Sequence, residues 1–498
     1  MNTERSSGIL LHPTSLPGKY GIGTLGKEAF HFIDFLSKSK QKLWQILPLG
    51  PTGFADSPYQ CFSSTAGNPL LIDLDVLVSE GLLDRKDLAG MEPFTDGPVN
   101  YGKVITNKYP LLKKAMVNFK AKAGKENKKD FHDFIVENNS WIEDYALFMS
   151  LKENFKQKPW YQWTKPLKTR KESALKPFYS QLADQIEFHK FIQYLFFRQW
   201  RAVKDYAHEK NIRIIGDIPL YVALDSVDAW ANTDLFQFDA DKNPVVVGGV
   251  PPDYFSATGQ LWGNPLYNWE VLKKDNYKWW IDRIKSNLVL YDIIRIDHFR
   301  GFAAYWSVPY GEKTAVNGKW IKCPGKDLFK QIRKELGELP IIAEDLGVIT
   351  DDVVELRDSF GLPGMKILQF AFDSSEENDY IPYNFTRNCV VYTGTHDNDT
   401  VKGWFDKAKP EDKKYVLEYM NTKGEDICMD FLRLAWASVA RTAIVPMQDL
   451  LGLGNEARMN LPGTTTNNWM WRARSQDFSK EIAGRLAQLT TLYGRTHK

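Results

Sequence analysis

Short apolar segments bounded by turn residues recur along the whole chain. Eight of them are rich in isoleucine, valine and leucine on both faces. Such segments are typical of parallel strands that are covered by helices. The eight predicted strands are GILLHP near residue 8, WQILPLG near 44, RIIGDIP near 213, DIIRID near 292, PIIAEDLG near 340, MKILQFAF near 365, CVVYTGTHD near 389 and TAIVPMQD near 442.

Helical patterns lie between most of these strands, for example KEAFHFIDFLSKSK before the second one. Eight successive strand–helix units predict an α/β fold, the (β/α)8 TIM barrel. We therefore interpret residues 1–498 as a single barrel. Two separate α/β domains are the alternative, which the regular spacing of the strands after residue 280 disfavours.

The second and third strands are too far apart for a single crossover helix. Between them lies IEFHKFIQYLFFRQWRAVKDYAHEK, in which Phe188, Phe191, Ile192, Leu195 and Phe196 fall on one helical face. We predict a mostly helical insertion over residues 76–205.

A second interruption separates the third and fourth strands. Residues 222–275 are rich in glycine, proline, asparagine and aromatic side chains, which favours an extended loop. We interpret this segment as a loop insertion that forms a lid over a ligand.

Acidic residues follow four of the predicted strands. Asp297, Glu344 and Asp397 lie at similar depth after their strands, and Asp217 ends a fourth. The carboxyl ends of barrel strands meet at the face where active sites lie. Arg295 and Asp297 alone fit a buried ion pair in a packed core, but four acids together favour a functional site.

Composition and charge narrow the class of protein. Lys and Arg total 64 against 62 Asp and Glu, so the net charge of +2 gives no electrostatic reason to expect nucleic acid or an anionic membrane as partner. The four cysteines form no C-x-x-C pair, which favours a reducing compartment. The amino-terminal segment lacks a signal-peptide pattern, and no apolar run approaches the ~20 residues of a membrane span. We expect a cytoplasmic protein.

Clustered carboxylates suit metal binding, proton abstraction or cleavage of a glycosidic bond. The eight histidines show no ligand spacing, so we predict no metal, although His298 and His396 each adjoin a key aspartate. Glycosidic chemistry needs one ionised and one protonated carboxyl group. Arg295 favours the ionised form of Asp297, and burial after PIIA favours the protonated form of Glu344.

A formal G-x-G-x-x-G pattern occurs in GIGTLG, at Gly21, Gly23 and Gly26. A dinucleotide site requires this pattern to follow a strand directly and an acid to stand about twenty residues later. Neither condition holds here, so we predict no dinucleotide and no other cofactor.

Long ordered motifs make the chain resemble the 4-α-glucanotransferases, also called amylomaltases or disproportionating enzymes, of glycoside hydrolase family 77 in the α-amylase clan. The resemblance runs from GILLHPTSLPGKYGIGTLG to MNLPGTTTNNWMWR. It includes WQILPLGPTG, DSPYQ, AGNPLLIDL, GDIPLYVA, PPDYFSATGQLWGNPLY, RIDHFRG, AEDLG and THDNDT.

The resemblance implies a catalytic barrel and a role for each acid. Asp297 is expected to be the nucleophile, Glu344 the general acid and base, and Asp397 the group that stabilises the transition state. The expected substrate contacts are Ser57, Tyr59, Asp217, Arg295 and His396 around the reacting sugar, Tyr254, Phe255, Gln260 and Trp262 in the lid, and Asn460 and Asn468 near the carboxyl end.

The implied reaction moves an α-1,4-glucan segment from a donor to the 4-hydroxyl of an acceptor glucose or glucan, with retention. The expected partners are α-1,4-glucans, maltooligosaccharides and glucose, in a monomer or homodimer. Maltodextrin, glycogen and starch metabolism all remain open as its setting. An α-amylase-like hydrolase is the nearest alternative, and a non-catalytic glucan-binding protein is the alternative from another class.

Overall fold

Eight parallel strands form the centre of the molecule, and all eight predicted segments are confirmed. The computed structural model describes residues 4–252, 256–372 and 378–496. The strands are β1 (Ser6–Leu10), β2 (Leu43–Gln45), β3 (Arg213–Pro219), β6 (Ile293–Asp297), β9 (Ile341–Ala343), β10 (Gly364–Ile367), β11 (Cys389–Tyr392) and β12 (Thr442–Pro446). Their order in the sheet is β10-β11-β12-β1-β2-β3-β6-β9.

The two ends of this sheet, β9 and β10, meet and close a TIM barrel. The N–H of Ala343 donates to the carbonyl of Pro363 over 2.9 Å. The N–H of Met365 donates to Asp345 Oδ1 over 2.7 Å, so a side chain supplies an acceptor at this seam. The predicted (β/α)8 fold is thus confirmed.

Alternate residues of each strand face opposite directions, as the pleat requires. Ile214 and Ile294 pack into the large core between strands and helices. Ile215 and Ile293 belong to the smaller apolar cluster inside the barrel. Both faces of the strands are therefore buried, which explains why the strand segments are apolar throughout.

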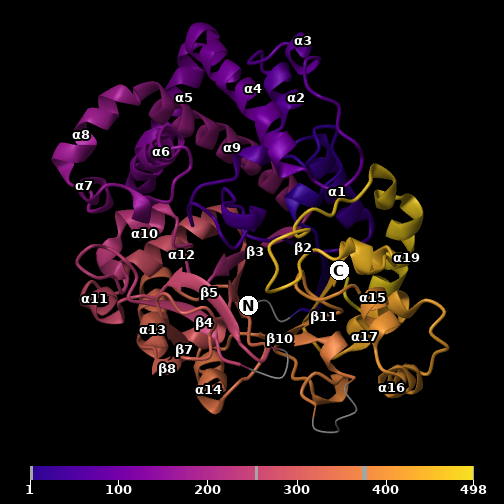
Figure 1. The fold of residues 1–498 in the computed structure, drawn as a ribbon. Coiled ribbons are helices and arrows are strands. Elements are labelled where there is room, and N and C mark those ends of the chain that lie inside the picture. The colour runs from indigo at the N-terminus through magenta and orange to yellow at the C-terminus, as the bar shows by residue number, and fades with distance from the viewer. Residues whose placement is uncertain (1–3, 253–255, 373–377, 497–498) are drawn as a thin grey trace.

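Helices lie around most of the barrel (Figure 1). Those that follow or precede barrel strands are α1 (Lys27–Lys38), α12 (Lys278–Leu290), α13 (Gly325–Leu336), α14 (Asp351–Ser359), α15 (Val401–Lys407), α16 (Pro410–Met420), α17 (Ile427–Ala437), α18 (Met447–Leu450) and α19 (Lys480–Leu492). The described residues between β10 and β11 form only short 3-10 helices, so this crossover departs from a regular unit.

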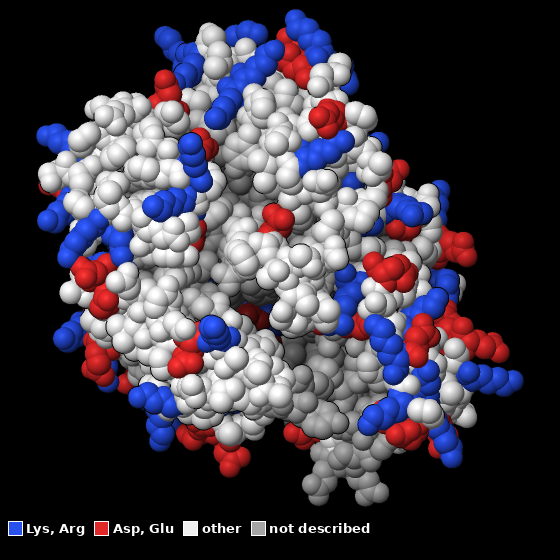
Figure 2. Space-filling view, viewed as in Figure 1, with Lys and Arg blue, Asp and Glu red and all other residues white. Residues whose placement is uncertain are grey.

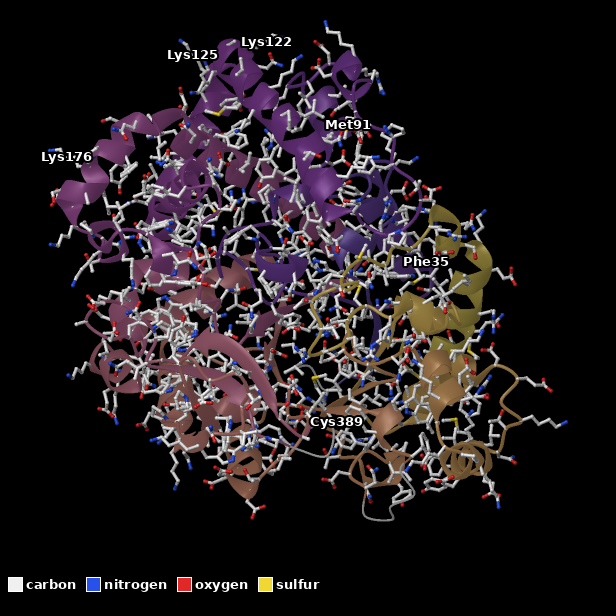
Figure 3. The ribbon with its side chains drawn as sticks, viewed as in Figure 1. Phe35, Met91, Lys122, Lys125, Lys176 and Cys389 are labelled. Atoms are coloured by element: carbon white, nitrogen blue, oxygen red, sulfur yellow. The ribbon has the colours of Figure 1, made fainter. Side chains whose placement is uncertain are left out.

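The chain between β2 and β3 is helical over most of its length. It contains α2 (Leu74–Ser79), α3 (Arg85–Leu88), α4 (Tyr101–Lys122), α5 (Lys125–Glu137), α6 (Asn139–Asn154), α7 (Lys165–Lys168), α8 (Glu172–Gln181) and α9 (Ala183–Glu209). Helices α4 to α8 project beyond the barrel at the top and upper left of Figure 1. Lys122, Lys125 and Lys176 lie on the outer edge of this region and are exposed (Figure 3).

The 222–275 segment is more ordered than the extended loop we predicted. It holds α10 (Val227–Ala231), β4 (Val246–Val250), β5 (Gln260–Pro265) and α11 (Trp269–Lys274). Strands β4 and β5 join β7 (Ala304–Pro309) and β8 (Lys319–Lys322) in an antiparallel sheet of order β5-β4-β7-β8. Strands β7 and β8, which complete this sheet, follow β6 in the chain. The sequence of segment 222–275 alone therefore does not reveal the pairing.

None of the helices within the described part of the chain is long and apolar enough to cross a membrane.

The buried guanidinium of Arg495 joins the carboxyl end of the chain to its first strand. Arg495 is fully buried, and its Nη1 donates to the carbonyl of Ser6 in β1 over 3.0 Å. Its other acceptors are the carbonyls of Ala435, Trp436, Ser438, Ala440 and Arg441, at 2.9 to 3.3 Å. Several of these carbonyls end helix α17 and lack helical partners, so the cation satisfies groups that burial leaves otherwise unbonded.

We predict that Arg495→Met lowers the free energy of unfolding by about 3 to 5 kcal/mol, because several buried carbonyls lose a charged donor at once. Urea unfolding followed by tryptophan fluorescence measures the change. The matched control is Arg485→Met, which removes an exposed arginine paired with Asp426 at 3.2 Å. It should change the free energy by no more than about 0.5 kcal/mol. Equal effects of both substitutions would contradict the role of Arg495.

Candidate active site

An ion pair inside the barrel, between Arg295 of β6 and Asp217 of β3, forms the base of the site. The two residues are register partners on adjacent strands, and both side chains point inward. Arg295 Nη1 lies 2.6 Å from Asp217 Oδ2, and the Asp217 side chain has no exposed surface. Tyr59 donates its hydroxyl proton to the same oxygen over 2.8 Å. Asp217 thus holds Arg295 and Tyr59, two other predicted site residues, in place.

Asp297, at the carboxyl end of β6, shares the same arginine. Its Oδ1 lies 3.1 Å from Arg295 Nη1, and its side chain is partly exposed. Burial raises the pKa of Asp297 to about 6, while the attraction of Arg295 opposes that rise and the charge of Asp217 adds to it. The expected pairing with Arg295 is present, but burial outweighs it in setting the pKa.

Glu344 follows β9 and is held by backbone donors. Its Oε2 accepts the N–H of His298 over 2.6 Å, and its Oε1 accepts the N–H of Leu346 over 2.9 Å. Burial raises the pKa of Glu344 to about 7, and the nearby charge of Asp297 contributes, whereas Arg295 and the two N–H groups lower it. Burial thus favours the protonated form of Glu344, and its role as the general acid stays a prediction.

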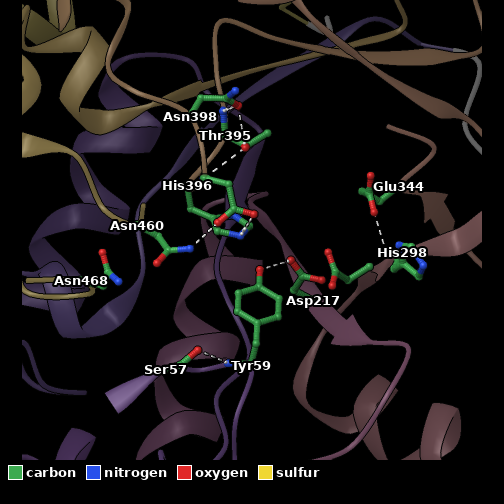
Figure 4. A network of polar contacts seen from close by, with 12 residues as sticks. Ser57, Tyr59, Asp217, His298, Glu344, Thr395, His396, Asn398, Asn460 and Asn468 are labelled. Atoms are coloured by element: carbon green, nitrogen blue, oxygen red, sulfur yellow. Dashed lines mark hydrogen bonds and ion pairs between the residues drawn. The ribbon is translucent and has the colours of Figure 1, made fainter. Parts of the chain in front are cut away.

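Asp397 follows β11 and has the opposite electrostatic environment. Burial would raise its pKa, but His396 and the amide of Asn460 outweigh burial and lower the pKa of Asp397 to about 2. His396 Nε2 lies 3.4 Å from Asp397 Oδ2, and Asn460 Nδ2 donates to Asp397 Oδ1 over 2.6 Å (Figure 4). Asp397 is therefore ionised near neutral pH, and its charge raises the pKa of Asp297.

Tyr59 links Asp217 to the Asp397 side of the site. Its ring stacks on the ring of His396, with centroids 5.1 Å apart and an interplanar angle of 18°. One ring face is thus covered by protein, and stacking of the tyrosine on a sugar stays a prediction. Ser57 accepts the N–H of Tyr59 over 3.2 Å and so shapes the turn that carries it.

The 222–275 segment reaches the site through Trp262. Trp262 Nε1 donates to Gln260 Oε1 over 3.1 Å, so the two predicted contacts on β5 are coupled. The Trp262 ring packs edge-on against His298, with centroids 4.7 Å apart. Tyr254 and Phe255 lie outside the described residues.

The two predicted asparagines differ in their surroundings. Asn460 touches Asp397 directly. Asn468 accepts the N–H of Leu461 over 3.0 Å and donates to the carbonyl of Thr464 over 3.1 Å, so its side chain stabilises its own loop. A substrate contact of Asn468 stays a prediction.

Several groups that complete the site were missed by the sequence analysis. The N–H groups of His298 and Leu346 hold Glu344, and Arg458 Nη2 donates to the carbonyl of Asp397 over 2.6 Å. Backbone donors carry no residue signature, and Arg458 lies in a segment whose only signal is its closeness to Asn460. Within the described ranges, no group of three or more His, Cys, Asp and Glu side chains is arranged to hold a metal ion.

The surface is hollowed near the centre of the molecule, and acidic atoms are visible deep in the hollow (Figure 2). Asp297 contacts the buried Arg295, and Glu344 and Asp397 interact with it electrostatically. This arrangement can supply an anionic nucleophile, a proton donor and a fixed negative charge to the same ligand.

The raised pKa of Asp297 predicts a pH-dependent effect of Asp297→Asn on stability. Because the folded protein holds the Asp297 proton more tightly than the unfolded chain, ionisation destabilises the fold as pH rises from about 4 to about 6. Relative to wild type, the variant should therefore gain about 1 to 3 kcal/mol of unfolding free energy between pH ~4 and pH ~7. Urea unfolding at each pH measures this gain.

Asp397→Asn is the matched control, because its expected effect on the free energy of unfolding has the opposite sign. The lowered pKa of Asp397 stabilises the fold above its unfolded pKa, so this variant should lose stability at neutral pH. The loss should disappear only as pH falls through about 2. A gain for Asp397→Asn, or a pH-independent effect of Asp297→Asn, would contradict the electrostatic account.

Comparison with known sequences supports the resemblance of the motifs. Residues 11–477 match the family described as 4-alpha-glucanotransferase, glycoside hydrolase 77. The 4-alpha-glucanotransferase of Clostridium butyricum is 51% identical over 490 residues, which cover 97% of this chain and 100% of that protein. The chloroplastic/amyloplastic 4-alpha-glucanotransferase of Solanum tuberosum is 47% identical over 99% of this chain and 87% of its own length.

Solved structures agree with these sequence matches. The structure of amylomaltase from Streptococcus agalactiae in complex with acarbose has a TM-score of 0.96 and 43% identity, and the match covers 99% of this chain and 100% of that one. The amylomaltase of Corynebacterium glutamicum has a TM-score of 0.80 at 17% identity and shows the fold alone. The chain belongs to the 4-alpha-glucanotransferase family, glycoside hydrolase family 77.

Proposed function

We propose that this protein transfers a segment of an α-1,4-glucan from a donor chain to the 4-hydroxyl of an acceptor glucose or glucan, by a retaining double displacement. The observation that carries the proposal is the contrast between two carboxyl groups beside one cation. Asp297 is ion-paired with Arg295, whereas Glu344 is held by backbone N–H groups and burial favours its protonated form. Retaining glycosidic chemistry requires this division of roles.

In the first displacement, a carboxylate oxygen of Asp297 attacks the anomeric carbon of the donor sugar. The bond from this carbon to the glycosidic oxygen breaks, and Glu344 gives its proton to that leaving oxygen. The products are a shortened glucan, a β-glucosyl ester on Asp297 and an ionised Glu344.

In the second displacement, Glu344 acts as a base. Its carboxylate removes the proton of the acceptor 4-hydroxyl, whose oxygen attacks the anomeric carbon and releases Asp297. Two inversions restore the α configuration. The N–H groups of His298 and Leu346 favour the carboxylate form that this step requires.

Asp397 supplies negative charge beside the anomeric centre, where positive charge develops in the transition state. His396 and Asn460 keep this carboxylate ionised and oriented. Tyr59 and Arg295 complete the wall of the reacting subsite, since both are fixed by Asp217.

The choice between transfer and hydrolysis depends on which hydroxyl reaches the glucosyl ester. Gln260 and Trp262, on β5, place a polar and an aromatic group beside the Glu344 side of the site. We infer that the 222–275 segment forms a lid that presents an acceptor sugar and excludes water. An α-amylase-like hydrolase is the alternative outcome of the assay below.

We predict that incubation with pure maltotriose yields glucose together with longer oligosaccharides, measured by chromatography over time. Asp297→Asn and Glu344→Gln should each reduce turnover by at least about 10³-fold, because each removes a group that acts in the transition state. Circular dichroism checks that both variants are folded. Products that are only shorter than maltotriose would favour the hydrolase, and wild-type rates in either variant would reject the assigned roles.

We also predict a bell-shaped pH dependence with its maximum between about 6 and 7. The rate falls at lower pH because Asp297 becomes protonated, and at higher pH because Glu344 loses its proton. Asp217→Asn removes a charge that raises the pKa of Asp297. The acid limb of the pH profile of Asp217→Asn should therefore move to lower pH, and a shift to higher pH would contradict this account.

A further inference from the structure

The turn from His298 to Arg300 lies between two parts of the molecule that the mechanism treats separately. On one side it contacts Glu344 and the loop that follows it. On the other side it contacts Trp262 of β5 and Trp320 of β8, both in the antiparallel sheet. No role in the proposed reaction accounts for the side chains of this turn.

His298 holds its backbone N–H toward Glu344 by adopting a left-handed conformation. Its φ is 53° and its ψ is 47°, values that a side chain with a Cβ rarely adopts. In this conformation the N–H donates to Glu344 Oε2 over 2.6 Å. The next N–H, of Phe299, donates to the carbonyl of Glu344 over 3.0 Å. Two successive donors of the turn thus fix both the side chain and the backbone of Glu344.

The ring of His298 keeps this turn in place by packing. Trp262 covers it edge-on at 4.7 Å, and the Tyr221 ring lies at 6.5 Å. Its Nε2 is buried and has no hydrogen-bond partner among the described residues. Burial, with a smaller effect of Arg300, lowers the pKa of His298 to about 3, so the ring is neutral in the working range of the site.

Arg300 also connects the loop that follows Glu344 to the antiparallel sheet. Its Nη1 donates to the carbonyl of Val348 over 2.5 Å, in the loop that begins at Glu344. Its guanidinium lies over the Trp320 ring, with the central carbon 3.9 Å from the ring centroid. Val348 itself is 65% exposed, so the contact of Arg300 is with the backbone of an exposed part of the loop.

We propose that the 298–300 turn is a positioning element for the general acid and base, in which His298 and Arg300 hold Glu344 and its loop against the antiparallel sheet. This inference rests on the proposed function, because it assigns His298 and Arg300 to the orientation of Glu344. The proposed reaction assigns neither residue a contact with the reacting atoms, so the role inferred for both is positioning.

The pH dependence of the rate is a readout that a purely structural role would not move. The charged or titratable groups that face Glu344 are Asp297 and Arg295 from β6 and Tyr380 from the segment before β11. All three stay in place in the variants below. Loss of the His298 N–H removes a donor to the carboxylate, which raises the pKa of Glu344 and moves the basic limb of kcat/KM to higher pH.

The test compares His298→Asn with His298→Val. Asparagine tolerates the left-handed conformation, whereas a β-branched residue does not. His298→Val should lower kcat by about 10²-fold and move the basic limb upward by about one pH unit. His298→Asn keeps the backbone conformation but loses the ring contact with Trp262, so its kcat and its basic limb should lie between those of wild type and those of His298→Val. If the ring acted only as apolar packing, valine would be tolerated better than asparagine, and that order would overturn the proposal.

Arg300→Lys tests the second connection without loss of charge. A lysine ammonium lacks the planar fork that lets Arg300 face Trp320 and still donate to Val348. We expect a fall in kcat of about tenfold with an upward shift of the basic limb. An unchanged pH profile in both Arg300→Lys and His298→Val would reject the positioning role even if the rates fell.

Asn421→Val is the control for backbone strain. Asn421 has a φ of 50° at the end of α16 and makes no contact with the site residues described above. The Asn421→Val substitution should lower thermal stability as His298→Val does, but leave the pH profile of kcat/KM unchanged.

Glu344→Gln separates the proposed function from the positioning role of the 298–300 turn. If it keeps its activity, the proposed function fails, and if it is inactive while the turn variants keep the wild-type profile, only the positioning role fails.

Discussion

The buried ion pair between Arg295 and Asp217 is the interaction on which the rest of the site depends. Removing two charges from water is costly, and a pair of this kind stabilises a fold only when its remaining hydrogen-bonding groups are satisfied. Tyr59 adds a hydrogen bond to Asp217 Oδ2 and Asp297 adds one to the Arg295 guanidinium, while Asp217 Oδ1 is buried without a hydrogen-bond partner among the described residues. The buried pair therefore fixes Tyr59 and Asp297, two predicted site residues, through hydrogen bonds, so the geometry of the site is tied to the interior of the barrel.

The strands and the acids of the site could be predicted from the sequence, because both follow local rules. A strand buried on both faces is apolar throughout, and an acid at its end stands out from that background, as Asp297 and Glu344 do. The antiparallel sheet was missed because β4 pairs not only with β5 but also with β7, which lies beyond a whole barrel strand. The donors to Glu344 could not be predicted either, since any residue supplies a backbone N–H and only the fold aims it.

The pKa values of Asp297, Glu344 and Asp397 differ because a few neighbouring groups act differently on each carboxyl. Burial acts on all of them in the same direction, so the differences arise from the neighbours. Asp397 has His396 and an amide, Asp297 shares its arginine with Asp217, and Glu344 has Asp297, Arg295 and two backbone donors. The site is consequently a place where the chain gives up stability to keep two carboxyl groups poised near neutrality.

The contacts of Arg495 also constrain when the barrel can close during synthesis. Strand β1 pairs with β12, and the carbonyl of Ser6 receives its charged donor from a residue 489 positions later. Ribosomes add about 5 to 20 residues per second, so the first strand waits roughly 25 to 100 s for these partners. Throughout that interval an apolar strand edge stays unpaired, which makes the nascent chain a natural client for chaperones and leaves barrel closure as a late event of biosynthesis.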